Sequence, residues 1–510
     1  MNRIQRILLP LLFLCVALPT TSGVMPEDTC SYEEKWDAAV SRFRNDNNLR
    51  NAQFGVCVMD LSTGSTLTGC NIDKSLVPAS TMKVVTSASA LRTLRPNYRF
   101  RTLVKHSGEI DASGVIQGNL IIEGGMDPTL GSYYFPDLTS FVDTVVTTLR
   151  KWNITGIRGQ VIAEEQISPI DAVPSKWMDE DIAETYGAGV HSLNYADNLF
   201  SLIIDTSGGR VRITDTVPHI RTLTIDNNMR AGSSRSGRYS PVAHRKKHSD
   251  VLVLNGTLRR MNDPIELVTP APRPSEGLCA DIRETLEAEG IFVENQITNY
   301  NPEESYVLLD YKSPALEEIV RSLLVRSDNM YAESVLRAVG QRKAGNPSRK
   351  ASVDAEVEVL EDWGIDLHGM TVYDGSGLSR SNKVTPLMLA KVLRASYLDM
   401  ASNSKLPSLL PVAGEEGTVK YLLRDTPLAG HISLKSGSMR GIRCYAGYYP
   451  TDAPKYAVVV MVNNFRCGDS RVKTSIERLL SDMFIENGEP IELPKQPLVM
   501  DEALTENNND

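Results

Sequence analysis

The stretch VPASTMKVVTSASAL, residues 77–91, combines a potentially reactive pair of side chains with an apolar helical pattern. Ser80 and Lys83 stand three positions apart, so a helix would place them one turn apart on the same face. Pro78 suits the first turn of a helix, and Pro96 marks the latest point at which this helix could end. The stretch therefore predicts a helix on which a lysine can take the proton of a serine hydroxyl.

The apolar context distinguishes this pair from two other S-x-x-K pairs in the chain. Ser402–Lys405 and Ser470–Lys473 have polar surroundings, which are typical of a surface serine and a solvated lysine. The residues that follow Lys83 are too apolar for a solvent-facing helix. Lys83 is therefore either extended toward the surface or held partly desolvated, and desolvation lowers the pKa of an amine toward that of a usable base.

Size and charge narrow the classes of function. A chain of 510 residues is long enough for two or three domains. The formal net charge of −9 argues against a nucleic-acid partner, because no basic excess exists to neutralise phosphates. The basic run HRKKHS, 244–249, is expected to be a solvated loop, since no acidic residue stands between its two histidines as a zinc-protease helix requires. The chain has no C-x-x-C pair, so structural zinc is not expected.

The N-terminus has the pattern of an export signal. Arg3 and Arg6 precede the apolar run ILLPLLFLCVAL, 7–18, and small and polar residues follow at 19–23. This order is typical of a secretory signal, and the apolar run is short for a membrane span. We predict a signal peptide at 1–23, with an uncleaved anchor as the alternative. The protein is accordingly expected to be exported, and to be periplasmic or associated with the cell envelope.

Export would place the six cysteines after the signal in an oxidising compartment, where an even number favours disulfides. Cys57 and Cys70 flank a predicted turn near 62–64, which would make them cross-strand partners in a hairpin. Buried free thiols are the alternative for all six. The candidate disulfides are Cys57–Cys70 and Cys444–Cys467, while the pairing of Cys30 and Cys279 stays open.

Three regions of the chain differ in pattern. Residues 26–98 predict a helix, a hairpin and the helix that carries Ser80. Residues 99–308 hold short β-runs punctuated by turn residues, which favour one or two small β-rich subdomains. In 309–490 helices return before three strands and a last helix, and the acidic residues 491–510 are expected to be a disordered tail. The pattern predicts one α/β (α+β) domain assembled from both chain ends, with a β-rich insert between them.

Two later motifs supply the groups that a serine nucleophile needs beside its base. Ser327 and Asn329 form an S-x-N at a predicted junction between helices, whereas a second S-x-N, 192–194, lies in the β-rich region. Lys435 and Ser436 begin the only K-[ST]-G of the chain, at the end of a predicted strand, and its glycine would let a substrate lie against the strand edge. The order S-x-x-K, S-x-N, K-[ST]-G is that of penicillin-binding proteins and serine β-lactamases.

Beyond these motifs, the sequence resembles the low-molecular-mass class C penicillin-binding proteins, the D-alanyl-D-alanine carboxypeptidase/endopeptidase family. The resemblance covers roughly residues 50 to 470, and a gap of 247 positions between Ser80 and Ser327 separates this family from β-lactamases, which lack such an insert. It implies a β-lactamase-like, or transpeptidase-like, serine hydrolase domain. The stretches that carry the resemblance are 77–91, 123–130, 186–194, 326–333, 373–382, 411–420 and 434–441.

The resemblance also implies a mechanism. Ser80 would attack the carbonyl of the penultimate D-Ala of a peptidoglycan stem peptide, Lys83 would take its proton, and Ser327 would relay a proton to the leaving amine. β-Lactam antibiotics would acylate the same serine, and no metal or organic cofactor is required. The substrate-binding residues would be Asn329 for the amide, Lys435 and Ser436 for the terminal carboxylate, and Ser438, which with Ser80 would form the oxyanion hole.

Two other functions are compatible with the motifs. One is a β-lactamase, and the other is a catalytically silent peptidoglycan-binding protein in which the insert is the working part. The motifs do not separate carboxypeptidase from endopeptidase activity, because both cut after the same D-Ala. They also do not predict an oligomeric state.

Overall fold

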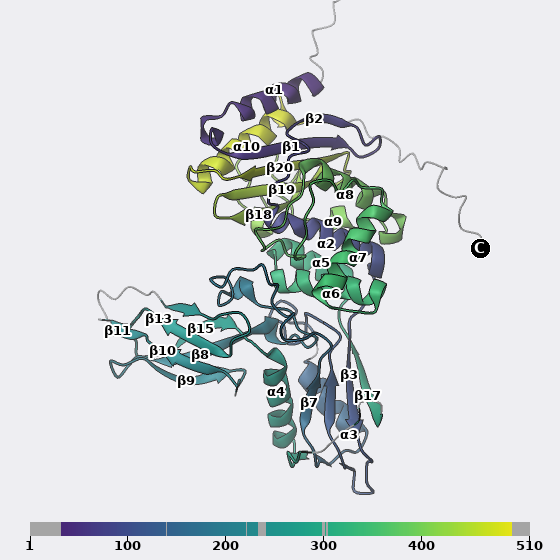
Figure 1. Cartoon of the computed structure of the whole chain (residues 1–510), viewed down its shortest axis with the longest axis vertical. Coiled ribbons are helices and arrows are strands. Elements are labelled where there is room, and N and C mark those ends of the chain that lie inside the picture. The colour runs from purple at the N-terminus through teal and green to yellow at the C-terminus, as the bar shows by residue number, and fades with distance from the viewer. Residues whose placement is uncertain are drawn as a thin grey trace, which may run out of the picture.

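The computed structural model describes residues 32–491 except 139, 221, 233–240, 298–300, 302 and 303. Figure 1 shows a body that contains both ends of this range, and two lobes formed by the middle of the chain. The predicted signal peptide, Cys30 and residues 492–510 of the predicted tail lie outside the described residues. Among the described residues, no helix combines the length and apolarity needed to cross a membrane.

The body is built on one antiparallel sheet whose strands come from opposite ends of the chain. Its order is β18-β19-β20-β1-β2, so the last strands of the sequence pair directly with the first. The alternation of side chains gives this sheet two buried faces, as expected for a central layer. The strands are β1 (Gln53–Asp60), β2 (Thr66–Cys70), β18 (Ser433–Met439), β19 (Ile442–Tyr449) and β20 (Tyr456–Asn463).

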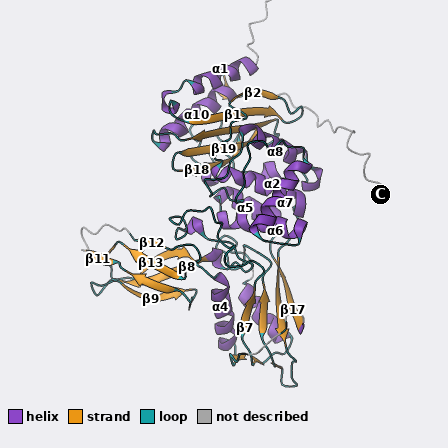
Figure 2. Ribbon diagram, viewed as in Figure 1, coloured by secondary structure: helices purple, strands orange, loops and turns teal. Residues whose placement is uncertain are grey.

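Helices cover the two faces of this sheet. On one face α1 (Tyr32–Arg44) and α10 (Asp469–Phe484) pack in a core around Trp36 and Phe484. The other face is covered by a larger helical layer, in which α2 (Met82–Leu94) is buried along nearly its whole length. Figure 2 shows this helical layer below the sheet. Its other helices are α5 (Leu316–Arg326), α6 (Asn329–Ala344), α7 (Arg349–Asp362), α8 (Pro386–Leu398) and α9 (Leu406–Leu409).

The sheet register shows that the predicted Cys57–Cys70 disulfide is wrong. Cys57 pairs with Gly69 and Cys70 pairs with Val56, so the two cysteines are offset by one residue. Since neighbouring positions on a strand point to opposite faces, Cys57 lies in the core beneath the helical layer and Cys70 packs against the opposite core. Both are free thiols.

The same geometry overturns the predicted Cys444–Cys467 disulfide. Cys444 on β19 is buried on the face of α2, whereas Cys467, after β20, packs against the core of α1 and α10. The sheet therefore separates the two thiols, and both are free, as is Cys279.

The middle of the chain forms two lobes with separate cores. In the first lobe a four-stranded sheet, β17-β3-β5-β7, packs with α3 and α4 around residues such as Leu149 and Ile282. This lobe contains β3 (Arg101–Ser107), β4 (Val115–Ile116), β5 (Leu120–Glu123), α3 (Phe141–Lys151), β6 (Gly156–Ile157), β7 (Val161–Glu164), α4 (Pro274–Ala288), β16 (Phe292–Val293) and β17 (Ser305–Lys312).

The second lobe consists of short strands around a smaller core that includes Leu202 and Leu254. Figure 1 shows it projecting sideways from the body and from the first lobe. Its strands are β8 (Leu199–Asp205), β9 (Arg212–Val217), β10 (Thr224–Asn227), β11 (Arg230–Gly232), β12 (Val242–His244), β13 (Val251–Asn255), β14 (Thr257–Arg259) and β15 (Ile265–Pro270). The sequence analysis predicted only β-rich subdomains in the insert and missed the helices α3 and α4. It also placed the end of the insert at residue 308, which lies inside β17.

Candidate active site

The nucleophile candidate lies at the start of the buried helix. Ser80 is the middle residue of a 3-10 turn, Ala79–Thr81, that leads directly into α2. Ser80 is half-buried, while Lys83, one turn further on, is fully buried. The ammonium nitrogen of Lys83 lies 3.0 Å from Ser80 Oγ, so the sequence-predicted pair is within hydrogen-bond distance.

Lys83 has two further partners, and both are carbonyl oxygens. Its Nζ donates to Asn329 Oδ1 at 2.6 Å and to the backbone oxygen of Ser376 at 2.6 Å. A carbonyl oxygen can only accept, so a neutral amine with two hydrogens would give both to these oxygens. Its lone pair would then point at the hydroxyl of Ser80, which is the geometry that a base requires.

Burial lowers the pKa of Lys83 to about 8, although the negative charges of Asp328, Asp374 and Glu333 oppose this shift. The structure therefore agrees with the alternative in which Lys83 is desolvated, and burial is the cause of its lowered pKa. None of these carboxylates is a hydrogen-bond partner of Lys83 Nζ; its partners are the hydroxyl and the two carbonyls.

Ser327 and Asn329 lie where α5 ends and α6 begins. Ser327 has a left-handed backbone (φ 64°), which turns the chain sharply, and Asp328 then caps α6 by accepting the Tyr331 N–H at 3.0 Å. The turn places Ser327 Oγ 2.9 Å from Lys435 Nζ. Asn329 instead faces Lys83, so the two residues of the S-x-N motif contact different lysines.

The K-[ST]-G motif lies on β18, an edge strand of the sheet. Lys435 is fully buried and donates to Ser327 Oγ and to the backbone oxygen of Ser436, at 2.9 and 2.8 Å. Burial and the nearby charge of Lys83 lower the pKa of Lys435.

The glycine of this motif has a packing role that was not predicted from the sequence. A Cβ at Gly437 would lie 2.6 Å from the carbonyl oxygen of Pro78 and 3.1 Å from the backbone nitrogen of Ser80. Gly437 is therefore needed because β18 packs directly against the turn that carries the nucleophile. The predicted role, room for a substrate on the strand edge, stays a prediction.

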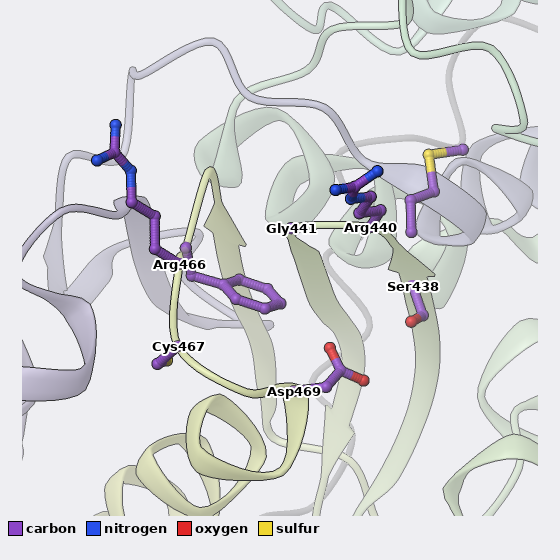
Figure 3. Close-up of a pocket in the computed structure, with 8 residues that line it drawn as sticks. Ser438, Arg440, Gly441, Arg466, Cys467 and Asp469 are labelled. Carbon is purple, nitrogen blue, oxygen red and sulfur yellow. The ribbon is translucent and has the colours of Figure 1, made fainter.

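Ser436 and Ser438 point to different surroundings. Ser436 Oγ donates to Thr418 Oγ1 at 2.6 Å, whereas Ser438 is exposed at the end of β18. Ser438 lines a cavity of about 700 Å³, shown in Figure 3. Ser80 is not among the residues that line it. The lining residues are Ser438, Met439, Arg440, Gly441, Phe465, Arg466, Cys467 and Asp469.

The competing motif matches have structural roles. Lys405 forms an ion pair with Glu317 at 2.8 Å, and Lys473 forms one with Glu477 at 3.3 Å. Asn194, in the second S-x-N, is fully buried and donates to Ser334 Oγ and to a backbone oxygen. Within the part of the chain that the structure describes, no three His, Cys, Asp or Glu side chains are grouped as a metal site would require.

Several residues that shape the site were not identified from the sequence. Ser376 acts through its backbone oxygen, and Asp374 organises the surrounding turn by accepting the Gly377 N–H at 2.7 Å. Thr418 is the partner of Ser436. These residues fall in 373–382 and 411–420, two stretches that carry the family resemblance. The resemblance marked both stretches as important, but the sequence indicated no physical role for their residues.

Comparisons with known proteins place this geometry in a family. The family described as D-Ala-D-Ala carboxypeptidase 3 (S13) matches residues 36–482, which include both chain ends of the body and the whole insert. The chain belongs to this family. The predicted family, the predicted serine D-Ala-D-Ala carboxypeptidase activity and the α+β fold class are thereby confirmed.

Individual relatives agree with this placement. The chain is 28% identical to the D-alanyl-D-alanine carboxypeptidase of Actinomadura sp. (strain R39), over 83% of this chain and 80% of that one. It is 25% identical to the D-alanyl-D-alanine carboxypeptidase DacB of Haemophilus influenzae, over 82% of this chain and 87% of that one. The crystal structure of penicillin binding protein 4 from Haemophilus influenzae has a similar fold, with a TM-score of 0.70 and 23% identity over 87% of this chain and 98% of that one.

Proposed function

We propose that this protein cleaves the terminal D-Ala-D-Ala bond of peptidoglycan stem peptides with Ser80 as nucleophile and Lys83 as its general base. The observation that carries the proposal is the set of three oxygens around Lys83 Nζ, of which only that of Ser80 can donate a proton. The neutral amine would take the Ser80 proton as the serine oxygen attacks the carbonyl carbon. A tetrahedral intermediate results, and its collapse would break the peptide bond and leave an acyl-enzyme.

We assign proton delivery to the leaving amine to Ser327. Its hydroxyl is held 2.9 Å from Lys435, a lysine that can replace the proton it gives up. Lys435 and Ser436 would bind the terminal carboxylate of the substrate. Burial and Lys83 lower the pKa of Lys435 in the free site, so an arriving carboxylate would favour its charged form.

The oxyanion hole is proposed to consist of the backbone N–H groups of Ser80 and Ser438. The close approach of β18 at Gly437 to the nitrogen of Ser80 supports this assignment, because it brings both donors to one edge. Asn329 is proposed to hydrogen-bond the substrate amide. Its Nδ2 already donates to the Tyr186 backbone oxygen at 2.8 Å, but an amide nitrogen carries a second hydrogen that a substrate carbonyl can accept.

The substrates and inhibitors follow from the same site. Water would hydrolyse the acyl-serine ester after the terminal D-Ala has left, and a β-lactam would form the corresponding covalent adduct. A cross-linked stem presents the same D-Ala carbonyl, so endopeptidase activity is part of the proposal. The relative release from pentapeptide and from cross-linked dimer would separate the two activities.

We also propose that the protein is exported to the periplasm or another part of the cell envelope, where peptidoglycan is found. The support is the charged, apolar and then small-residue order of residues 1–23. Cell fractionation of the full chain, compared with a chain that lacks 1–23, tests this. Retention of the full chain in the cytosol would overturn it.

The release of free D-alanine from a pentapeptide stem tests the catalytic assignment. The wild-type protein should release it, Ser80→Ala should not, and Ser402→Ala is the matched control because Ser402 belongs to a structural S-x-x-K pair. Release by Ser80→Ala at the wild-type rate would overturn the proposal.

A further inference from the structure

The two carbonyl partners of Lys83 are themselves held by one short segment of the insert. This segment runs from Trp177 to Tyr186, within the part of the chain between the first lobe and the second. Tyr186 accepts a hydrogen bond from Asn329 through its backbone oxygen, and Trp177 donates one to Asp374 through its indole nitrogen. Both bonds cross from the insert to the catalytic body.

The contact with Tyr186 determines which way the Asn329 amide faces. Because Asn329 Nδ2 donates to the Tyr186 oxygen at 2.8 Å, its Oδ1 is turned toward Lys83 at 2.6 Å. The reverse orientation would place Asn329 Oδ1 against the Tyr186 carbonyl oxygen, which are two acceptors with no hydrogen between them, and would place the amide N–H groups against Lys83 Nζ. The insert therefore supplies an acceptor that keeps a carbonyl oxygen on Lys83.

The contact with Trp177 acts through the turn that contains Ser376. Asp374 Oδ1 accepts the Gly377 N–H and the Asn382 side-chain amide, both at 2.7 Å. Asp374 Oδ2 accepts the Ser379 N–H at 2.7 Å and the Trp177 indole N–H at 2.9 Å. The carboxylate thus fixes the turn on both sides of Ser376, whose backbone oxygen reaches Lys83.

Trp177 is placed by a well-anchored segment. Its side chain is 1% exposed, and its backbone N–H donates to the Pro174 oxygen at 3.0 Å. A few residues earlier, Asp171 accepts hydrogen bonds from the fully buried Arg337 of α6 at 2.7 Å and from the Arg349 N–H at 2.5 Å. The segment is therefore fixed to the same helix that begins with Asn329.

We propose that the insert segment 177–186 is a positioning element of the acylation step, and that Trp177 is a positioning residue that aims Lys83 at Ser80 through Asp374 and the Ser376 carbonyl. This inference rests on the proposed role of Lys83 as base. A neutral amine gives its two hydrogens to the oxygens of Asn329 and Ser376, so a shift of either oxygen turns the lone pair away from Ser80. The insert therefore contributes to the position of Lys83 in the active site, in addition to forming the two lobes.

The test is Trp177→Phe, which keeps an aromatic ring and removes the indole N–H. The measured quantity is the rate constant of acylation by labelled penicillin as a function of pH, together with the fraction of protein that is finally labelled. We expect the rate constant at the optimal pH to fall about tenfold or more, because a displaced Ser376 oxygen misaligns the amine. We also expect the acid limb to move to lower pH, because the ammonium form loses an acceptor.

A purely structural role would change the labelled fraction or the melting temperature but neither the rate constant nor the pH profile. Trp152→Phe is the matched control, since Trp152 lies in the insert with 53% of its surface exposed. If Trp177→Phe does not fold, site-specific replacement of Trp177 by benzothienylalanine keeps the shape of the ring system and removes only the N–H. A wild-type rate constant and pH profile in either variant overturns the proposal.

The failure of this inference can be distinguished from the failure of the proposed function. If Lys83→Arg acylates as fast as the wild type, Lys83 is not the base, and both proposals fail. If Lys83→Arg is inactive and Trp177→Phe behaves as the wild type, only the positioning role of the insert fails.

Discussion

A lysine in the insert and the two lysines of the active site are all buried, but their surroundings are opposite. Lys105, on β3, lies 2.7 Å from Glu123 and 3.0 Å from Glu164. Burial by itself would lower the pKa of Lys105, yet the contacts with the two carboxylates raise it overall. Lys83 and Lys435 contact hydroxyl and carbonyl oxygens, and their pKa values are lowered.

The difference shows how one residue type gives either a stable ion pair or a proton acceptor. Carboxylate partners keep Lys105 charged, so it stabilises a sheet. Neutral partners satisfy the hydrogen bonds of Lys83 without stabilising its charge to the same extent, which leaves the amine able to lose a proton near neutral pH.

Among the changes at Gly437, Glu356 and Thr418, Gly437→Ala should have the largest effect. The added Cβ would meet the Pro78 oxygen at 2.6 Å, so β18 must move away from the turn that carries Ser80. We expect the acylation rate to fall about a hundredfold, since displacements on the order of 1 Å at a reacting centre have effects of that size. Gly208→Ala in the insert, where nothing lies within 4 Å of the added Cβ, should leave the rate unchanged.

Glu356→Gln tests a buried acidic side chain in the body, whose pKa is raised. Glu356 is fully buried, and burial raises its pKa to about 8, although a hydrogen bond with the Thr86 side chain opposes this shift. Its folded-state pKa lies above the unfolded value, so its contribution to stability is complete below about pH 4.5 and is lost as the pH rises through about 8.

The free energy of unfolding of the wild type should therefore fall with rising pH in this interval by up to about 1.4 kcal/mol per pH unit from this group. Urea titrations at several pH values should show a weaker dependence for Glu356→Gln. The control is Glu284→Gln on α4, whose side chain is 58% exposed and which should keep the wild-type dependence. If the free energy of unfolding of Glu356→Gln changes with pH as steeply as that of the wild type, Glu356 is not a neutral carboxyl in the folded protein.

Thr418→Val should have the smallest effect. The change keeps the shape of the side chain and removes the hydroxyl that contacts Ser436 Oγ at 2.6 Å. Losing one hydrogen bond of this kind costs about 1 kcal/mol, so kcat/KM for D-alanine release should fall about fivefold. Thr222→Val, which removes a hydroxyl bonded to Glu276 at the surface of the insert, should leave kcat/KM unchanged.

The sequence predicted the parts of the molecule that depend on local pattern. The helix after Ser80, the short strands within 99–308 and the three final strands of the body follow from apolar spacing and turn residues. The candidate catalytic residues were selected because their motifs are short and occur in a fixed order. Family resemblance then supplied roles that no spacing could give.

The sequence could not predict features that depend on register or on contacts between distant segments. A one-residue offset between β1 and β2 placed Cys57 and Cys70 on opposite faces, and no sequence pattern reveals such an offset. The contacts of Ser376 with Lys83 and of Trp177 with Asp374 join residues 293 and 197 positions apart. Each involves a backbone oxygen or a buried carboxylate, whose partner is decided only when the chain has folded.

The most direct test of the central claim is the acylation rate of three lysine variants with labelled penicillin between about pH 6 and about pH 9. In the wild type the rate should rise with pH through about 8, because the base must be neutral and the pKa of Lys83 is lowered to about 8. Arginine cannot give up its proton in this range, so Lys83→Arg should lose at least about a hundredfold at every pH.

Lys435→Arg keeps the charge that binds a carboxylate and should retain part of the activity, and Lys105→Arg keeps its ion pairs in the insert and should acylate as the wild type does. The account predicts the order Lys105→Arg, then Lys435→Arg, then Lys83→Arg, from fastest to slowest. A Lys83→Arg protein that acylates as fast as Lys435→Arg would contradict it.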